Sequence, residues 1–503
     1  MQRQLHKHFE AYQKARRDFV QMVAESAMKS ENLPILMELN VLALLRPLLL
    51  DIIPTIQQIA ALSVSRLALF NEKNAEEIVT SGMLPEVLTG LQSNDSNSRK
   101  SACQILKSVA KHSPSLAEGV TNSGCLPMIT ECLKSNDPSL KEASASALGS
   151  IAIHNSTLAQ KVVDIGSLPL IVQGINGTDN NQKRVCIQAL GNIASHSPSL
   201  TQSIIEANSI APISMLFKVN DSKLKHQCCV TLSQIAKHSV DSAELVVESG
   251  AIPQVLVAMN ENDNNVRVSA AQLIYEIVHH TQELSSSVLG MGAAASLVKY
   301  IKSGSDPIPA VSAVGHIASF SSSFANTLLD QGAHIACLNV FGSSKQDTCK
   351  AVSAWALGQI GKHSSETSSS LSSLNALSLL LSGYCEKDAS LSLKNNTKEA
   401  LKLIIQNCED IESLQPLILR SPEPILRRVL AQVSTLLSKF PKYRVPFVSS
   451  GSFRDVQQIK SEPGSKLRSI INAINDSYPD QTVRFYSPEY AKELNKEVEQ
   501  HKI

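Results

Sequence analysis

Aromatic residues, net charge and long apolar runs are all scarce in this sequence. Aromatics make up 4% of the 503 residues, and the formal net charge is +1. Proteins that bind nucleic acid through their overall charge usually carry a strong basic excess. No stretch approaches the roughly 18 apolar residues of a membrane-spanning helix, and the first residues contain no apolar signal-peptide core. We therefore expect a cytoplasmic protein with neither a nucleic-acid nor a membrane partner.

The residues of known catalytic and metal-binding motifs are missing as well. The ten cysteines are scattered without a CxxC pair, which predicts small buried thiols in a reducing compartment. The sequence contains no GxxxxGK[ST], GxGxxG, GxSxG or HExxH motif. We expect no catalytic residue, no metal, no cofactor and no small-molecule substrate. The protein is thus predicted not to be an enzyme.

A fixed interval of 42 residues runs through the chain instead. It separates five histidines, His112, His154, His196, His238 and His280. A second column of Gly or Asn keeps nearly the same interval. It comprises Asn40, Gly82, Gly124, Gly166, Asn208, Gly250, Gly292, Gly332 and Asn375. One hydrophobic core stops growing near roughly 300 residues, whereas stacked repeats each bury an apolar face against the next. This column marks nine units, and two further units with a weaker repeat pattern lie near Asn407 and Gly451.

The segment 113–153 shows the pattern of one unit. A first helix is expected over 113–124, with Pro114 in its first turn and Gly124 ending it in a left-handed conformation. A second is expected over 126–133, and a third from Asp137 to His154. Aspartates precede the third helix at the same interval: Asp95, Asp137, Asp179, Asp221 and Asp263. Each is placed to cap it.

Three helices in about 42 residues are typical of armadillo repeats, because tetratricopeptide and ankyrin units are shorter. We predict an all-α fold, a right-handed superhelical armadillo solenoid of about nine to eleven units. Its third helices would line a concave groove. We divide the chain into an N-terminal helical cap (1–28), armadillo repeats (29–408), a degenerate terminal repeat (409–455), and a C-terminal helix with an aromatic tail (456–503).

The histidine column has two interpretations. A metal or pH-sensing ladder needs the imidazoles to converge, yet packed helices lie about 8–10 Å apart and zinc–nitrogen bonds are about 2.0–2.1 Å long. A histidine at a helix C-terminus can instead bond to free carbonyl groups, where the helix dipole favours it. We favour the second, structural interpretation.

A column of basic residues lies four residues after the capping aspartates. It comprises Arg99, Lys141, Lys183, Lys225 and Arg267, and Lys350 occupies the matching position further on. Each side chain could pair with its own aspartate or simply solvate its helix. Alternatively, the six form a basic edge that docks an acidic partner.

The expected floor of the groove lies eight and four residues before the histidine slot, which Phe70, Phe320 and His363 occupy in further repeats. Nuclear-import armadillo proteins carry Trp and Asn there in repeat after repeat, whereas this chain has one tryptophan, Trp355. We therefore do not expect an import-cargo array. Trp355 and Gln359 stay as candidate groove contacts, with groove packing as the alternative role for Trp355.

Four aromatic residues gather near the carboxyl end, within thirteen residues: Tyr478, Phe485, Tyr486 and Tyr490. They either fold back as a cap on the last repeat or form a docking segment, since aromatic side chains are favoured interface anchors.

Longer segments carry a specific resemblance. Among them are FEAYQKARRDFVQMVAE, LKHQCCVTLSQIAKHSVDSAELVVE, AVSAWALGQIGKHSSE and, in the tail, VRFYSPEY. From about residue 8 to 495 the chain resembles the sperm-associated antigen six family, armadillo-repeat proteins of the central apparatus of motile cilia and flagella. The resemblance implies a non-enzymatic scaffold of the axonemal cytoskeleton, bound to a central-pair microtubule and required for motility.

The same resemblance implies partners among the central-apparatus proteins, direct or indirect contact with the microtubule, and self-association. The alternative function is a soluble armadillo adaptor that binds extended peptides in its groove for transport or signalling.

Overall fold

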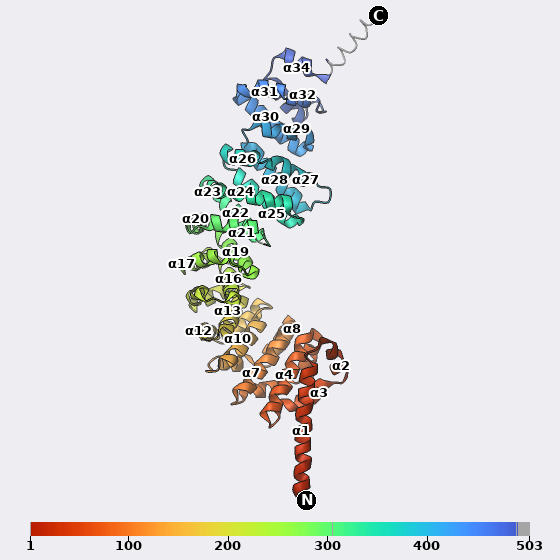
Figure 1. Cartoon of the computed structure of the whole chain (residues 1–503), viewed down its shortest axis with the longest axis vertical. Coiled ribbons are helices and arrows are strands. Elements are labelled where there is room, and N and C mark those ends of the chain that lie inside the picture. Colours follow the sequence, from red (N-terminus) through yellow and green to blue (C-terminus); the bar gives the residue numbers. More distant parts are fainter. Residues whose placement is uncertain (1, 304, 489, 491–503) are drawn as a thin grey trace. The chain divides into compact units, whose positions relative to one another are not determined.

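The computed structural model describes residues 2–303, 305–488 and 490, and every regular element within them is helical. The chain divides into two compact units, Met1–Ala258 and Met259–Ile503. Each unit is described by itself below. Figure 1 shows the helices in chain order, coloured from the N-terminus to the C-terminus.

The first unit is a series of short helices, each third one longer than its neighbours. Its helices are α1 (Gln2–Ser26), α2 (Leu33–Glu38), α3 (Val41–Leu45), α4 (Pro54–Phe70), α5 (Glu72–Thr80), α6 (Leu84–Gln92), α7 (Ser96–Ala110), α8 (Pro114–Asn122), α9 (Leu126–Cys132), α10 (Pro138–Ala152), α11 (Ser156–Asp164), α12 (Leu168–Ile175), α13 (Asn180–Ala194), α14 (Pro198–Glu206), α15 (Ile210–Met215), α16 (Ser222–Ala236), α17 (Val240–Glu248) and α18 (Ile252–Ala258). Short 3₁₀ turns are η1 (Ser30–Asn32), η2 (Arg46–Leu50) and η3 (Leu216–Lys218).

The second unit continues the same order. Its helices are α19 (Asn264–Val278), α20 (Gln282–Gly290), α21 (Ala293–Ser303), α22 (Ile308–Phe320), α23 (Ser322–Asp330), α24 (Ala333–Ser343), α25 (Asp347–Gly361), α26 (Ser365–Ser372), α27 (Ala376–Cys385), α28 (Leu391–Asn407), α29 (Ile411–Arg420), α30 (Glu423–Lys439), α31 (Arg444–Ser449), α32 (Ser452–Gln457), α33 (Lys466–Asn475) and α34 (Asp480–Tyr486). The turn η4 (Pro441–Tyr443) precedes α31.

Left-handed residues separate the first and second helices of each repeat. Gly124 has a φ of +83°, and the asparagines in its column, Asn40, Asn208 and Asn375, have φ of 51°, 57° and 57°. Glycine adopts this conformation without a Cβ clash, and asparagine tolerates it better than most residues. The predicted column is confirmed, because all its members have positive φ: Asn40, Gly82, Gly124, Gly166, Asn208, Gly250, Gly292, Gly332 and Asn375.

The aspartate column starts the third helices as predicted. The Asp95 carboxylate accepts the backbone N–H of Ser98 at 2.9 Å, and the Asp137 carboxylate accepts that of Ser139 at 2.9 Å. Such caps satisfy N–H groups that have no partner inside the helix. Side-chain bonds at the caps hold the pKa of both Asp95 and Asp137 below its usual value, the largest contributions coming from the Ser98 and Ser96 hydroxyls respectively.

The histidine column joins each repeat to the one before it. The ring Nε2 donates to a carbonyl oxygen near the end of the preceding third helix: His112 to Ala68 (2.7 Å), His154 to Ala110 (2.6 Å), His196 to Ala152 (2.7 Å), His238 to Ala194 (2.7 Å) and His363 to Ala318 (2.6 Å). The structural interpretation of this column is confirmed. The bonded carbonyl lies 44 or 45 residues upstream, so the histidine satisfies its neighbour's helix end.

Small residues let the third helices approach closely. A Cβ on Gly149 would lie 3.2 Å from Ala189 in the next third helix, and one on Gly358 would lie 2.8 Å from the Ala400 backbone. Backbones at such distances leave no room for rings between them, which explains why aromatic residues are so rare. The pairs α10 with α13 and α25 with α28 pack in this way.

The last part of the second unit departs from the repeat. One repeat position holds two helices, α29 and α30, instead of three. Helix α33 packs along α30. Leu467, Ile471 and Ile474 form the buried face of α33, as their spacing predicts. The proposed boundary at 455/456 falls inside α32 (Ser452–Gln457), and the division into four segments stays a prediction.

Candidate protein-binding groove

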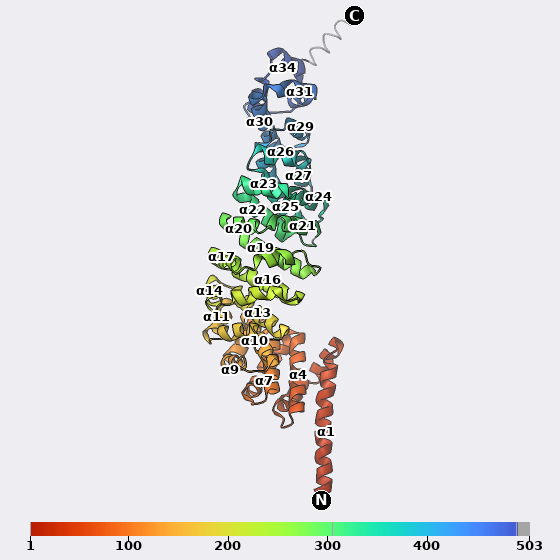
Figure 2. The ribbon, with the colours of Figure 1, turned by 60° about the vertical axis from the view of Figure 1, so that its left-hand side comes forward.

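A groove of about 660 Å³ lies in the first unit, lined by the third helices of four successive repeats. These helices are α4, α7, α10 and α13, which contact one another in that order and lie side by side in Figures 1 and 2. The lining includes all eight floor residues of these repeats: Leu62, Arg66, Gln104, Ser108, Ser146, Ser150, Gln188 and Asn192. The floor therefore lies where the sequence placed it.

Three cations line this groove, and its lining contains neither Asp nor Glu. They are Arg66 on α4 and Lys107 and Lys111 at the end of α7. Arg66 Nη1 donates to the Ala24 carbonyl of α1. Burial lowers the pKa of Lys107; the nearby Glu142 opposes this shift, while Lys111 adds to it. The charge inside the groove is thus positive, although the whole chain is almost neutral.

Apolar side chains alternate with these cations. Leu62, Leu69 and Ile153 also line the groove, and they are 38%, 46% and 48% exposed. Toward α10 and α13 the lining is uncharged and mixes hydroxyl and amide side chains with apolar ones such as Val185 and Ala189. The Asn192 amide donates to the Gly149 carbonyl at 2.9 Å. One end of the groove is therefore basic and apolar, and the other offers hydroxyl and amide groups.

The predicted basic column lies elsewhere, near the starts of the third helices. Its six members are all half-buried: Arg99, Lys141, Lys183, Lys225, Arg267 and Lys350. In the first unit four of them occupy equivalent positions on neighbouring helices, α7, α10, α13 and α16. Arg99 Nε is buried without a hydrogen-bond partner.

In the second unit the members of this column are held by internal contacts. Arg267 donates to the Met259 carbonyl at 3.3 Å and to the Ser303 hydroxyl at 2.7 Å, with its guanidinium over the Tyr300 ring. Lys350 Nζ lies 2.9 Å from a Glu386 oxygen, from the end of α27. The two cations therefore bridge repeat elements, and the proposed edge docking stays a prediction.

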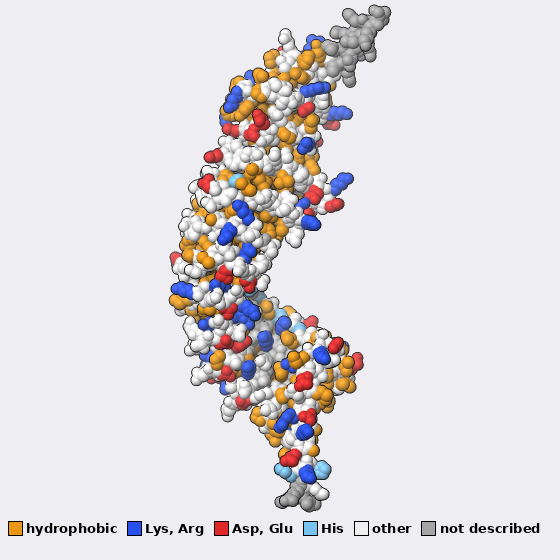
Figure 3. Space-filling model, viewed as in Figure 1, with side chains coloured by type: hydrophobic (Ala, Val, Ile, Leu, Met, Phe, Trp, Pro, Cys, Tyr) orange, Lys and Arg blue, Asp and Glu red, His pale blue; other side chains and the backbone are white. Residues whose placement is uncertain are grey.

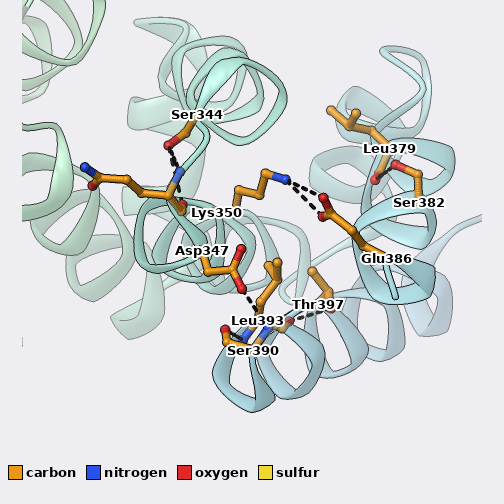
Figure 4. Close-up of polar contacts among 10 residues, drawn as sticks. Ser344, Asp347, Lys350, Leu379, Ser382, Glu386, Ser390, Leu393 and Thr397 are labelled. Carbon is orange, nitrogen blue, oxygen red and sulfur yellow. Dashed lines mark hydrogen bonds and ion pairs between the residues drawn. The ribbon is translucent and has the colours of Figure 1, made fainter. Parts of the chain in front are cut away.

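Figure 4 shows how Lys350 and its neighbours join successive repeats. The side chain of Lys350 on α25 points toward Glu386, and Asp347 on the same helix points toward the start of α28. The Asp347 carboxylate accepts the Ser390 N–H at 2.6 Å, and that bond lowers the pKa of Asp347. These contacts hold α25, α27 and α28 together.

Trp355 and Gln359 also lie on α25. The Trp355 indole packs directly on Gly315 of α22, where an added Cβ would lie 2.2 Å from Cζ3, and its ring centroid is 4.8 Å from that of His316. The Gln359 side chain accepts a bond from Lys362 at 2.8 Å. On the α19 side, the rings of Tyr275 and His279 also contact His316, with centroids 5.6 and 5.9 Å from the centroid of its ring. We call these four residues, Tyr275, His279, His316 and Trp355, the ring ladder.

The aromatic tail residues divide into inward and outward positions. The centroid of the Tyr478 ring lies 4.4 Å from that of Phe453 in a tilted contact, and the Tyr478 hydroxyl donates to the Arg444 carbonyl at 3.0 Å. Tyr486 also contacts Phe453, at 5.8 Å. Phe485 is 60% exposed and touches Tyr486 and Tyr490. Both the capping and the docking interpretation of the tail remain predictions.

Comparison with known proteins agrees with the helix pattern. A model of the armadillo/β-catenin-like repeat family matches residues 120–153, which contain the end of α8 and all of α9 and α10. The chain therefore contains an armadillo repeat at these residues. An engineered protein of known crystal structure aligns with it at a TM-score of 0.68 and 19% identity, covering 86% of this chain and 97% of the other. That likeness concerns the fold alone, and the predicted all-α armadillo architecture is confirmed.

Two curated relatives carry the more specific resemblance. Sperm-associated antigen 6 of Homo sapiens is 42% identical over 156 residues, and that of Mus musculus is 41% identical over the same length. Each match covers 31% of this chain and 31% of the relative. The resemblance inferred from the sequence is thereby confirmed over about a third of the length of these relatives.

The described part of this armadillo-repeat protein contains no group of three His, Cys, Asp or Glu side chains that could hold a metal ion. All ten cysteines are free, and all but Cys385 are buried. No single described helix is long and apolar enough to cross a membrane, although three sharply bent helix pairs would pass by length and composition alone.

Sequence reasoning placed Arg66 on the groove floor but missed the other two groove cations, Lys107 and Lys111. A signal was present, because Lys111, Lys237 and Lys362 each directly precede a histidine of the 42-residue column. Figure 3 shows basic and acidic side chains interspersed over the face that it draws. A charge count of the whole chain therefore hides the local positive charge beside Lys107.

Proposed function

We propose that this protein is a non-enzymatic scaffold of the central apparatus of motile cilia or flagella. It would associate with a central-pair microtubule through protein–protein contacts and be required for beating. The observation that carries this proposal is the 42% identity to sperm-associated antigen 6 over 156 residues. The armadillo architecture supports it, because stacked repeats provide long surfaces for holding other proteins.

The proposed partners are central-apparatus proteins, with the microtubule contacted directly or through them, and other copies of this chain. The proposed location is the axoneme within the cytoskeleton. A scaffold of this kind needs no converging catalytic groups, and its sites are surfaces such as the groove of the first unit and the aromatic tail.

Localisation of a tagged copy in isolated motile axonemes tests this proposal. After demembranation and a salt wash, we expect the protein to stay with axonemes that contain the central pair and to be missing from axonemes that lack it. Immunoblots of the pellet and supernatant measure the partition. Complete release into the detergent supernatant would refute the scaffold proposal.

The second candidate function is a soluble adaptor that binds extended peptides. The open groove on α4, α7, α10 and α13 favours this candidate. It predicts the opposite partition, with the protein in the detergent supernatant together with a bound partner. The same extraction therefore separates the two candidates.

A further inference from the structure

The first half of α1 projects from the first unit. Downstream of Phe19 the helix packs against α4, and its side chains Val20 and Val23 are 0% and 3% exposed. Upstream of Phe19 every described side chain of the helix is exposed or half-buried. Figures 1 and 2 both show this half extending beyond the other helices of the unit. A helical surface is therefore present that the repeats do not cover.

Arg16 marks the place where the projection begins. Its guanidinium forms an ion pair with Asp51, whose side chain is 1% exposed, in the link between η2 and α4. A buried carboxylate that loses its partner is strongly destabilised, so this pair fixes α1 on the first repeat. The helix before Arg16 has about 14 residues, and at 1.5 Å per residue it is about 21 Å long.

The projecting half carries an apolar stripe that continues the packed face of the helix. Phe9, Tyr12, Arg16, Phe19 and Val23 follow one another at intervals of three and four residues, which places them on one side of a helix. In the packed half of α1 this side meets the repeat. In the projecting half Phe9 and Tyr12 are 55% and 59% exposed. Two large rings in water favour an apolar surface of a partner.

Basic residues surround the same half of the helix. The segment 6–17 contains four Lys or Arg residues and one acidic residue, Glu10. Lys7 and Lys14 are exposed, and 3.6 residues per turn place them about 150° from Phe9 and Tyr12. A membrane surface or a single partner helix would cover the apolar stripe and leave these two lysines in water. A partner that encloses the helix, with acidic groups around an apolar groove, contacts both sides.

Proteins of one class combine these features. Calcium-loaded EF-hand sensors open a methionine-rich apolar groove for an amphipathic helix, and their ion-binding loops are rich in Asp and Glu. We infer that the projecting half of α1 is a target helix for an EF-hand calcium sensor, which encloses it in the calcium-loaded state with Phe9 and Tyr12 as apolar anchors. This contact goes beyond the proposed scaffold role, because it adds a partner whose binding depends on calcium.

Fluorescence anisotropy with the full-length protein and labelled calmodulin tests the inference. In calcium we expect a dissociation constant of about 1 µM or tighter. In EGTA the apolar groove closes, and binding should weaken at least tenfold. No binding in calcium, or equal binding in EGTA, overturns the inference. Axonemal retention does not enter this assay, so its result is independent of the proposed function.

Matched substitutions locate the apolar anchors. Phe9→Gln with Tyr12→Gln should weaken calmodulin at least tenfold. Leu391→Gln with Val445→Gln is the control, because these side chains are 75% and 74% exposed in the second unit, and it should change the affinity less than twofold. Circular dichroism verifies the fold of both variants. An equal loss in the two variants would overturn the assignment to α1.

A second pair tests whether the partner encloses the helix. Lys7→Gln with Lys14→Gln should weaken calmodulin at least threefold and reduce the dependence of its affinity on salt. Lys302→Gln with Lys345→Gln removes two exposed charges of the second unit and should have less than a twofold effect. An unchanged affinity of the Lys7/Lys14 variant would contradict an enclosing partner.

Two other occupants of this surface would overturn the inference. Cosedimentation with vesicles of phosphatidylcholine and phosphatidylserine tests a membrane, and we expect the protein to stay in the supernatant. Sedimentation velocity tests a second copy of this chain, and we expect wild type and the Phe9/Tyr12 variant to show the same oligomeric state. Vesicle binding, or a dimer, that is lost in the Phe9/Tyr12 variant would assign the stripe to that occupant instead.

Discussion

The groove of the first unit and the ring ladder of the second occupy the same columns of the repeat, yet they differ in kind. In the first unit the floor positions hold small polar residues such as Ser146 and Ser150, and a groove stays open. In the second, Trp355 and His316 occupy those columns and their rings contact each other at a tilt of 58°. The same repeat backbone thus carries an open groove in one unit and packed rings in the other, and the side chains in these columns decide which is present.

One column shows the difference most clearly. The position five residues before the histidine slot is Gly or Ser in most repeats, as in Gly149, Gly191 and Gly315. The exceptions are Lys107 in the first unit and Tyr275 in the second. Lys107 gives the groove a half-buried charge, and Tyr275 extends the ring ladder.

The largest expected effect comes from crowding the ring ladder with Gly315→Ala. Ala normally stabilises a helix interior relative to Gly by about 1 kcal/mol, but here its Cβ would lie 2.2 Å from Trp355. We expect a net loss of about 2 kcal/mol in unfolding free energy, measured by urea denaturation. Trp355→Leu should restore most of that loss in the double variant.

Gly290→Ala is the matched control, because nothing lies within 4 Å of the added Cβ. It should leave the unfolding free energy nearly unchanged. If Gly315→Ala were as mild as this control, the close packing of Trp355 on α22 would be wrong.

The next effect comes from placing a ring in the open groove with Ser146→Trp. Ser146 occupies the same column as Trp355, and an indole there would cover Lys107 and occupy the groove. If the groove takes an extended peptide, as the adaptor candidate requires, we expect that peptide to bind at least tenfold more weakly by fluorescence anisotropy, which equals about 1.4 kcal/mol. Stability should change little. Ser115→Trp on the exposed face of α8 is the control and should bind normally; a loss of binding there would contradict a groove-specific effect.

Removing the hydrogen bond from a column histidine to the preceding repeat should lower the unfolding free energy by the same amount in either unit, because both units have the same repeat backbone. His154→Ala and His363→Ala each leave a carbonyl, of Ala110 or Ala318, without its 2.6 Å partner. We expect each variant to lose about 1 kcal/mol of unfolding free energy, measured by chemical denaturation. His363→Asn should lose less, since Asn407 already makes this kind of bond to Lys362 at 2.6 Å. Costs that differ strongly between the units would show that the links are not equivalent.

The smallest expected effect is a dependence of the unfolding free energy on pH, which arises from the ring ladder. Burial, and then the nearby His279, lowers the pKa of His316 to about 4 from 6.5; Glu276 lies beside His279 at 4.0 Å. The unfolded chain takes up a proton on this residue below pH 6.5, whereas the folded chain does so only near pH 4. The contribution of His316 to stability is therefore complete above pH 6.5 and falls as the pH drops to 4.

The size of this pH effect should be on the order of 1 kcal/mol, because solvent reaches part of the ring and screens it. Urea midpoints of His316→Gln and wild type should differ in slope between pH 6.5 and 4.5. Parallel curves would contradict the lowered pKa. The open groove should add no change of stability with pH between pH 6.5 and 4.5, because its charged side chains are Lys and Arg, which stay protonated in that range.

The local signals in the sequence were sufficient for the helices of the repeats. The capping of α10 by Asp137 and the left-handed turn at Gly124 depend on residues within a few positions of each other. The floor of the groove followed from the same period, because a third helix shows the same face in every repeat.

The partners of long side chains could not be predicted in this way. Arg267 and Lys350 share a column, yet one lies over Tyr300 and the other bonds to Glu386. The histidines were expected at helix ends, but only the packed structure shows that the carbonyl belongs to the preceding repeat. Lys107 and Lys111 escaped prediction as groove residues because the groove around them is made by three other helices.

The sequence by itself determined the repeat length, the three helices of each unit, their caps and the residues that face the groove, because these depend on neighbours along the chain. Only the tertiary structure decided which repeats leave that groove open and where its charge gathers. A side chain such as Lys107 or Trp355 meets residues about 40 positions away, and its surroundings are fixed by how closely successive helices approach.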